Sequence, residues 1–170
     1  MPSGRVLHGA HEGVHVLRFV GEIRYPLAPA VTKLMSTFFE EGELVGLVAD
    51  LCETTSIDST NLGMLARFGN RLARQRGGRL TLVCDRAELL ELLESMGFRD
   101  FFEIVETKRG EPALADEHVE AGAIDPAELG RVMLAAHRTL MEMSEENRET
   151  FREVVASLER DLQMGSDPDT

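Results

Sequence analysis

Four features are scarce or missing in this 170-residue chain: tryptophan, cysteine, long apolar runs and, in its last third, positive charge. There is no Trp and only one Tyr, yet 43% of the residues are hydrophobic, which predicts an aliphatic core. Two Cys are too few for a disulfide framework and are typical of a reducing compartment. Nowhere do 18 consecutive apolar residues occur, which argues against a membrane-spanning helix. Residues 1–10 contain no sustained apolar run, so we expect no signal peptide and a cytoplasmic location.

Positive charge is scarce mainly in the last third of the chain. Residues 1–109 carry 13 Lys and Arg against 15 Asp and Glu, whereas residues 110–170 carry 5 against 15. The net charge of −12 argues against nucleic-acid binding, because the phosphate backbone would be repelled. The length fits one domain, or one domain with an extension, and the uneven charge indicates two functional parts.

Strand and helix patterns alternate through the first two thirds of the chain. We expect strands at 5–9 and 14–20, a helix at 26–41, a strand at 44–51, a helix at 59–76, a strand at 80–84, a helix at 87–96 and a strand at 101–105. Gly21 is expected to end the first hairpin, and the apolar run 44–51 is typical of a strand covered on both faces. This order predicts an α/β fold: a mixed sheet with parallel central strands and helices packed against it.

The last third has a different pattern. Residues 108–124 are rich in Gly, Pro, Glu and Ala and are expected to form a linker. Asp125, with Pro and Glu at the following first and third positions, marks a helix start. Apolar residues then recur every three or four positions, so residues 125–164 are expected to form an acidic helical extension, with a disordered tail at 165–170. The extension is either one long helix or a hairpin broken at Ser144, and its apolar stripe must be buried against something.

The most specific pattern lies in the polar turn before the second helix. Asp58, Ser59 and Thr60 follow an apolar strand and open a helix, where backbone N–H groups are unpaired and the helix dipole favours negative charge. A phosphate on either hydroxyl would be stabilised there. Alternatively, Asp58 or Ser59 only caps the helix.

This segment resembles the phosphorylation loop of the STAS domain, the fold of bacterial anti-sigma factor antagonists. The family pattern is a strand, then Asp-Ser-Ser/Thr-Gly/Ala-Leu-Gly, then a helix, and the match here runs from Asp58 to Gly63 with Asn61 as a departure. The resemblance covers roughly residues 5–106 and implies a STAS-like mixed sheet in a domain at 1–107. It also implies a non-enzymatic regulator without a cofactor. That regulator binds an anti-sigma factor when it is unphosphorylated, and phosphorylation releases it.

The resemblance further implies partners and site residues. The anti-sigma factor is usually a serine/threonine protein kinase of the histidine-kinase-like ATPase type, and a serine/threonine phosphatase restores the bound form. The implied acceptor is Thr60, with Ser59 as the second choice. The implied partner-binding surface consists of Asp58, Ser59, Thr60, Asn61, Gly63, Met64, Arg67 and Arg71. Gly21 and Glu22 are candidates for the same face, and the two arginines alternatively belong to a solvated helix face.

Three alternatives remain open for the acidic extension: a homodimer contact, a site for a second partner, or a lid across the domain. A second function also fits the resemblance, namely a STAS subunit of a membrane transporter or a lipid-trafficking ATPase assembly. In such an assembly the same turn contacts an ATPase or a permease, and phosphorylation plays no role. No Walker-type loop or local catalytic motif supports an enzyme.

Two further groups of side chains, three histidines and two cysteines, have residue types found in metal or redox sites. His8, His11 and His15 are close in sequence, but strand geometry does not bring all three together, so we expect no metal site. Cys52 and Cys84 end two central strands and are expected to be buried thiols.

Overall fold

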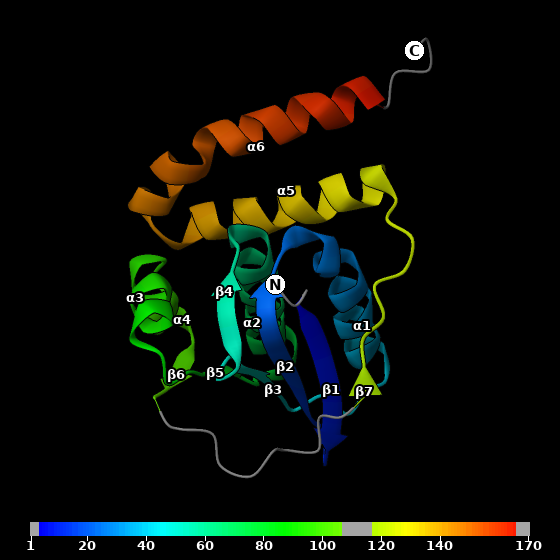
Figure 1. Cartoon of the computed structure of the whole chain (residues 1–170), viewed down its shortest axis with the longest axis vertical. Coiled ribbons are helices and arrows are strands. Elements are labelled where there is room, and N and C mark those ends of the chain that lie inside the picture. Colours follow the sequence, from blue (N-terminus) through cyan, green and yellow to red (C-terminus); the bar gives the residue numbers. More distant parts are fainter. Residues whose placement is uncertain (1–3, 107–116, 166–170) are drawn as a thin grey trace.

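The structure is a computed structural model that describes residues 4–106 and 117–165. Its centre is one mixed sheet with the strand order β6-β5-β3-β2-β1-β7, and β4 pairs with the C-terminal end of β2. The strands are β1 (Arg5–His11), β2 (Val14–Ile23), β3 (Gly46–Asp50), β4 (Thr54–Ile57), β5 (Leu80–Val83), β6 (Glu103–Val105) and β7 (Glu117–His118). The pairs formed by β2, β3, β5 and β6 are parallel, whereas β1 is antiparallel to both β2 and β7. The α/β fold predicted from the sequence is therefore confirmed (Figure 1).

Strand β2 continues past Gly21, where the sequence predicted the end of the hairpin. Gly21 has a φ of +83°, a conformation that other L-residues rarely adopt, and the register shifts between Gly21 and Glu22. Beyond this irregularity β2 pairs with β4, a segment predicted as polar turn. Thr54 is buried there, and its hydroxyl donates to the carbonyl of Phe19 at 2.7 Å. The hydrogen bond allows a polar residue inside the core.

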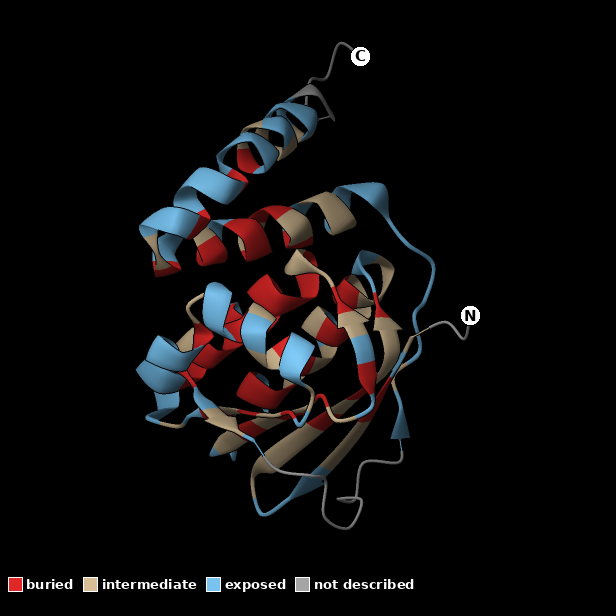
Figure 2. Ribbon diagram, turned by 60° about the vertical axis from the view of Figure 1, so that its left-hand side comes forward, coloured by how far each residue is buried: buried red, intermediate tan, exposed pale blue. Residues whose placement is uncertain are grey.

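Helices cover one face of this sheet (Figure 2). They are α1 (Ala28–Glu40), which follows the 3-10 turn η1 (Tyr25–Leu27), α2 (Ser59–Arg76), α3 (Ala87–Ser95) and α4 (Phe98–Phe101). Buried and half-buried residues alternate along β3 and β5, so these strands are covered on one face rather than on both, as the run 44–51 predicted. The last predicted strand starts only at Glu103, because residues 98–101 form α4.

The C-terminal extension forms a helical hairpin of α5 (Pro126–Met143) and α6 (Glu145–Gly165). Ser144 breaks the helix with an extended backbone, and its Oγ accepts a hydrogen bond from the backbone N–H of Asn147 at 3.1 Å. Helix α5 lies across the ends of α2 and α1, and α6 packs on the outer side of α5 (Figure 1). The hairpin therefore forms a separate layer over one end of the domain.

Two predicted segments lie partly outside the described residues. Within the predicted linker, residues 117 and 118 form β7 and add an edge to the sheet beside β1. Of the predicted tail at 165–170, Gly165 is the last residue of α6, and the rest lies outside the described residues. Within residues 4–106 and 117–165, no helix combines the length and apolar character needed to cross a membrane.

Candidate partner-binding site

Helix α2 begins directly after β4, with Asp58 as its N-cap residue. The Oδ1 atom of Asp58 accepts hydrogen bonds from the backbone N–H of Asn61 at 3.0 Å and from its side-chain Nδ2 at 2.9 Å. Asn61, the departure from the family pattern, thus adds a second hydrogen bond to the cap. The backbone N–H of Asp58 donates to the carbonyl of Ile23 at 3.1 Å. The start of α2 is therefore held to the end of the sheet by side-chain and backbone contacts.

The two candidate acceptor hydroxyls differ in exposure. Ser59, the first residue of α2, is half-buried, whereas Thr60 is only 3% exposed. We use the name acceptor face for the six predicted site residues of the first turns of α2: Asp58, Ser59, Thr60, Asn61, Gly63 and Met64. Of these six residues, Asp58 and Ser59 are partly exposed and the other four are buried.

Helix α5 packs on the acceptor face. A Cβ atom added to Gly63 would lie 2.3 Å from the carbonyl oxygen of Ala136 in α5, far inside van der Waals contact. Only glycine permits the two backbones to approach so closely. Gly63, which matches the family pattern, is therefore a point where the backbones of the domain and its extension come close together.

A hydrogen bond joins the first candidate hydroxyl to α5. The Oγ of Ser59 lies 2.9 Å from Nε2 of His137, and Nδ1 of His137 lies 2.7 Å from the carbonyl oxygen of Met133. Because a carbonyl only accepts, Nδ1 carries the proton, and in the neutral ring Nε2 accepts from the Ser59 hydroxyl. The His137 ring also meets Phe151 of α6 edge-on, with 5.4 Å between the ring centroids. His137 thus connects the acceptor turn to both helices of the hairpin.

The predicted basic residues lie further along α2. Arg67 is exposed and Arg71 is half-buried, with its guanidinium 4.2 Å from the centroid of the Phe39 ring. Glu22 pairs with Ser56 in the ladder between β2 and β4, next to the strand that leads into α2. The structure therefore brings all the predicted site residues to one end of the domain or to the helix that starts there.

The histidines near the first hairpin form a stacked pair. Nε2 of His8 and Nδ1 of His15 lie 2.9 Å apart, and both rings stack on Phe38. Burial lowers the pKa of His8 and of His15 from the ordinary histidine value. In the part of the chain that the structure describes, no three His, Cys, Asp or Glu side chains are grouped to hold a metal ion.

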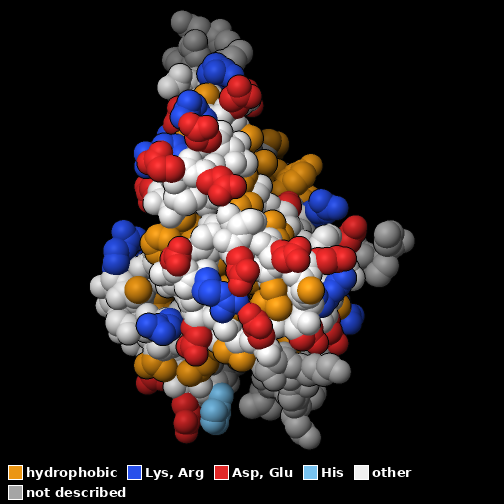
Figure 3. Space-filling view, turned by 90° about the vertical axis from the view of Figure 1, so that its left-hand side faces the viewer, with side chains coloured by type: hydrophobic (Ala, Val, Ile, Leu, Met, Phe, Trp, Pro, Cys, Tyr) orange, Lys and Arg blue, Asp and Glu red, His pale blue; other side chains and the backbone are white. Residues whose placement is uncertain are grey.

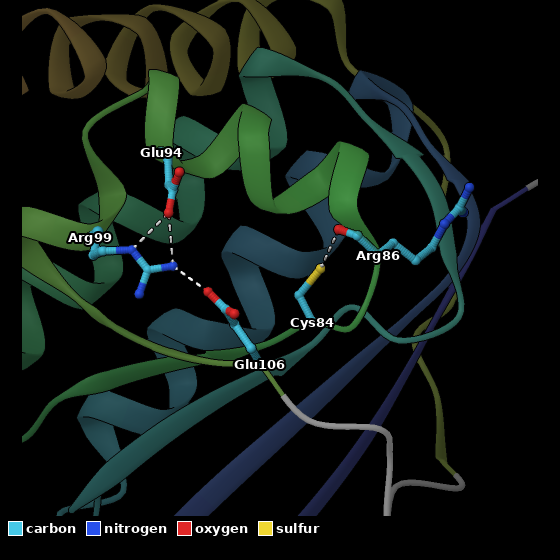
Figure 4. Close-up of polar contacts among 5 residues, drawn as sticks. All are labelled: Cys84, Arg86, Glu94, Arg99 and Glu106. Carbon is cyan, nitrogen blue, oxygen red and sulfur yellow. Dashed lines mark hydrogen bonds and ion pairs between the residues drawn. The ribbon is translucent and has the colours of Figure 1, made fainter.

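Both cysteine thiols have raised pKa values. Burial, reinforced by the neighbouring Asp50 side chain, raises the pKa of Cys52 to about 12. Burial also raises the pKa of Cys84, whose thiol donates to the carbonyl of Arg86 at 3.7 Å (Figure 4). A thiol with a raised pKa is a poor nucleophile at neutral pH.

An exposed ion-pair bridge centred on Arg99 lies in the same part of the domain as Cys84. Arg99 donates to Glu94 at 3.0 Å and to Glu106 at 2.6 Å, which joins the α3–α4 region to the end of β6 (Figure 4). All three side chains are about half exposed, so the bridge contributes little to stability.

Ala136 and His137, which cover the acceptor face, were not among the site residues predicted from the sequence. A signal of covering was present, because residues 62–66 contain no charged side chain and a helix that is apolar all round is buried on every side. That signal indicates a cover, but the periodicity does not identify the element that provides it.

Comparisons with known proteins agree with this geometry. The family model described as STAS domain matches residues 9–110. An anti-sigma factor antagonist from Mycobacterium paratuberculosis is 25% identical and has a TM-score of 0.54, and the match covers 62% of this chain and 87% of that chain. The anti-sigma factor antagonist SpoIIAA in its unphosphorylated form is 16% identical with a TM-score of 0.53, covers 59% and 87%, and shares the fold. No curated protein matches the chain. Helices α5 and α6 lie outside the family match.

Proposed function

Since this chain belongs to the STAS domain family, we propose that it is an anti-sigma factor antagonist in a partner-switching pathway. In this proposal it binds an anti-sigma factor, a serine/threonine kinase of the histidine-kinase-like ATPase type, while it is unphosphorylated. Phosphorylation in the first turn of α2 releases it, and a serine/threonine phosphatase restores binding. The observation that carries the proposal is the start of α2, where Asp58 caps a helix that offers two successive hydroxyls.

A phosphate in this turn would act on binding through charge. It adds about −1.5 to −2 charges at neutral pH, next to the carboxylate of Asp58. The positive end of the helix dipole stabilises the phosphate within the domain. A partner that packs closely on the same turn would then face like-charge repulsion and the desolvation of a dianion. A loss of about 3 kcal/mol weakens binding more than a hundredfold.

Burial favours Ser59 over Thr60 as the acceptor. A kinase must reach the hydroxyl, and Ser59 is half-buried at the helix start while Thr60 is 3% exposed. We therefore rank Ser59, the second choice from the sequence, ahead of Thr60. The partner-binding surface in this proposal remains the acceptor face with Arg67 and Arg71 at its edge.

The test of this function is phosphate mapping on the protein isolated from its native cells. We expect a fraction of molecules to carry one phosphate, on Ser59, and the exposed Thr55 in β4 to serve as an unmodified control. Phosphate on Thr60 would keep the mechanism and move the acceptor by one residue. If neither hydroxyl carried phosphate under any growth condition, the proposal would fail in favour of a transporter or lipid-trafficking subunit.

A substitution then tests the consequence for binding. Ser59→Glu is expected to weaken binding of the kinase that phosphorylates the wild-type chain, and Thr55→Glu, on the exposed side of β4, is expected to leave it unchanged. Calorimetric titration of the purified kinase into each variant measures both. Equal affinities for the two variants would contradict release by charge at the start of α2.

A further inference from the structure

We propose that the C-terminal helical hairpin is an intramolecular cover of the acceptor face, and that the anti-sigma partner or kinase gains access only when this cover is displaced. The inference rests on the proposed function, because it concerns the regulation of that same face. It selects the lid among the three alternatives that the sequence left open for the acidic extension.

The contact leaves no room for a second protein on the acceptor face. Ala136 is 1% exposed, and its carbonyl oxygen would lie 2.3 Å from a Cβ at Gly63. Around this contact Thr60, Asn61 and Met64 are at most 3% exposed. A partner that used these residues would have to occupy the space of α5, so binding of the partner and of the hairpin is mutually exclusive.

The same contact also blocks the proposed acceptor. The hydroxyl of Ser59 is engaged by Nε2 of His137 at 2.9 Å. Phosphorylation attaches to Oγ a phosphorus atom that carries three further oxygens, and the buried His137 ring, with Nε2 2.9 Å from Oγ, lies on one side of the space that this group would need. Phosphorylation of Ser59 in this arrangement therefore requires the same displacement of α5 as partner binding.

The hairpin is built to move as a unit. Except for the two-residue β7, every strand of the described sheet precedes residue 106, so displacement of α5 and α6 breaks no central strand pairing. Helix α6 packs mainly on α5, and its described buried side chains are only Asn147, Phe151 and Val155. Charged side chains of both signs lie on the surface of the hairpin, at the upper end of the view in Figure 3. Arg138 of α5 forms an ion pair with Glu159 of α6 at 2.7 Å. The two helices can therefore stay together when they leave the domain.

One polar contact links the far end of the hairpin to the domain. Nδ2 of the buried Asn147 donates to the carbonyl of Met96 at 2.9 Å, next to the start of α4. This contact lies outside the acceptor face. A partner that arrives at α2 therefore competes first with the Gly63–Ala136 and Ser59–His137 contacts of α5.

The test changes only α5, so the acceptor face keeps its own residues. Ala136→Glu places a carboxylate at the contact with Gly63 of α2, and Ala127→Glu makes the same substitution at an exposed position in the first turn of α5. Native-state hydrogen exchange of the full chain is measured first. In the wild-type chain we expect the amides of α5 and α6 to exchange through a lower-energy opening than those of β2, β3 and β5. Exchange of the hairpin and the sheet in one global step would overturn the inference.

Binding is then measured with each purified kinase of the histidine-kinase-like ATPase type encoded in the same genome. The apparent affinity of a covered site falls by the fraction of molecules in which the site is open. We therefore expect Ala136→Glu to bind at least tenfold more tightly than the wild-type chain and to be phosphorylated faster, with Ala127→Glu equal to wild type. If Ala136→Glu does not fold, His137→Ala replaces it and is expected to shift binding in the same direction by a smaller factor.

The outcomes separate the two proposals. Equal binding by the wild-type chain and Ala136→Glu would overturn the cover and leave the proposed function in place. Binding by neither chain, with α5 shown by hydrogen exchange to be released in Ala136→Glu, would overturn the proposed function itself.

Discussion

The STAS region at residues 4–106 and the hairpin of α5 and α6 differ in net charge and in the sequence separation of the contacts that hold them together. The first is nearly neutral and joins strands that are distant in sequence, as in the pairing of β2 with β4. The second is acidic and consists of two consecutive helices, of which α5 packs on both α6 and α2. The first matches a family, and the second lies outside the match. The family match and the turn at Asp58 to Thr60 thus reside in one region, while α5, which packs on that turn, belongs to the other. The family match therefore describes the turn itself but not the helix that packs on it.

The largest expected effect is on the alkylation rate of a cysteine. Both cysteines lie in the STAS region, so this rate reports on the folding of that region and not of the hairpin. With a pKa of about 12 against 9.0 in the unfolded chain, Cys52 is expected to react with iodoacetamide at pH 8 at least about a hundredfold more slowly in the folded protein than in urea. The raised pKa favours the neutral thiol, so its contribution to stability is complete below pH 9 and is lost as the pH rises toward 12. Mass spectrometry of the alkylated peptides gives the rates.

The alkylation rate of Cys52 also tests whether the hairpin can open while the sheet stays folded. Variants that release α5 are expected to leave the Cys52 rate unchanged, because the sheet remains folded. Faster alkylation in Ala136→Glu than in the wild-type chain would show that the hairpin and the sheet open together.

Two helical glycines provide the next largest effect, with opposite signs. Gly63→Ala is expected to lower the free energy of unfolding by about 1–3 kcal/mol, because its methyl group would meet the backbone of Ala136. Gly130→Ala in α5 is expected to be neutral or to stabilise by up to about 1 kcal/mol, since alanine is the better helix former and its nearest neighbour is the end of the Leu162 side chain, at 3.1 Å. Urea unfolding measures both, and equal effects at the two positions would contradict the close contact of α2 with α5.

The hydrogen bond between the two regions is expected to contribute less. A double-mutant cycle of Ser59→Ala and His137→Ala should give a coupling of about 0.5–1.5 kcal/mol in the free energy of hairpin opening. The readout is hydrogen exchange of α5 amides, and Thr55→Ala combined with His137→Ala serves as the uncoupled control. Additive effects of Ser59→Ala and His137→Ala would show that this hydrogen bond does not stabilise the contact between the two regions.

The smallest expected effect concerns the stacked histidines. Burial lowers the pKa of His15 in the folded protein, so the fold favours the neutral ring. The corresponding stability is present above about pH 6.5 and is lost as the pH falls below that value. His15→Gln is expected to flatten the decrease in the free energy of unfolding between pH 7.5 and 5.5, whereas His11→Gln, at an exposed position, is expected to leave it unchanged. A steeper decrease in His15→Gln would be the contrary result.

Local signals predicted the elements whose ends are set by short-range chemistry. Residue type predicts the N-cap at Asp125 and a cap at either Asp58 or Ser59, and the side chains of Asp125 and Asp58 accept hydrogen bonds from the first turn of their helices. Helix α2 ends where Gly77 takes a φ of +67°. These interactions join residues only a few positions apart, so they can be predicted from the local sequence.

Elements that depend on distant partners were missed. Strand β4 has the polar sequence Thr-Thr-Ser, and it is a strand only because β2 continues past Gly21 to pair with it. The same holds for the coverage of β3 on one face, since an apolar run does not state how many layers pack on it.

By itself the sequence determined the order of strands and helices, the capped start of α2 with Ser59 and Thr60, and the resemblance to the STAS family. It also determined that the stripe of residues 125–164 must be buried. Only the tertiary structure decided that this stripe covers α2, that Gly63 lies against Ala136, and that His137 meets Ser59. The physical reason is that periodicity determines which face of a helix avoids water. The identity of the surface that this face meets is set by shape and contact between distant segments, such as Ser59 and His137, which are 78 residues apart in the chain.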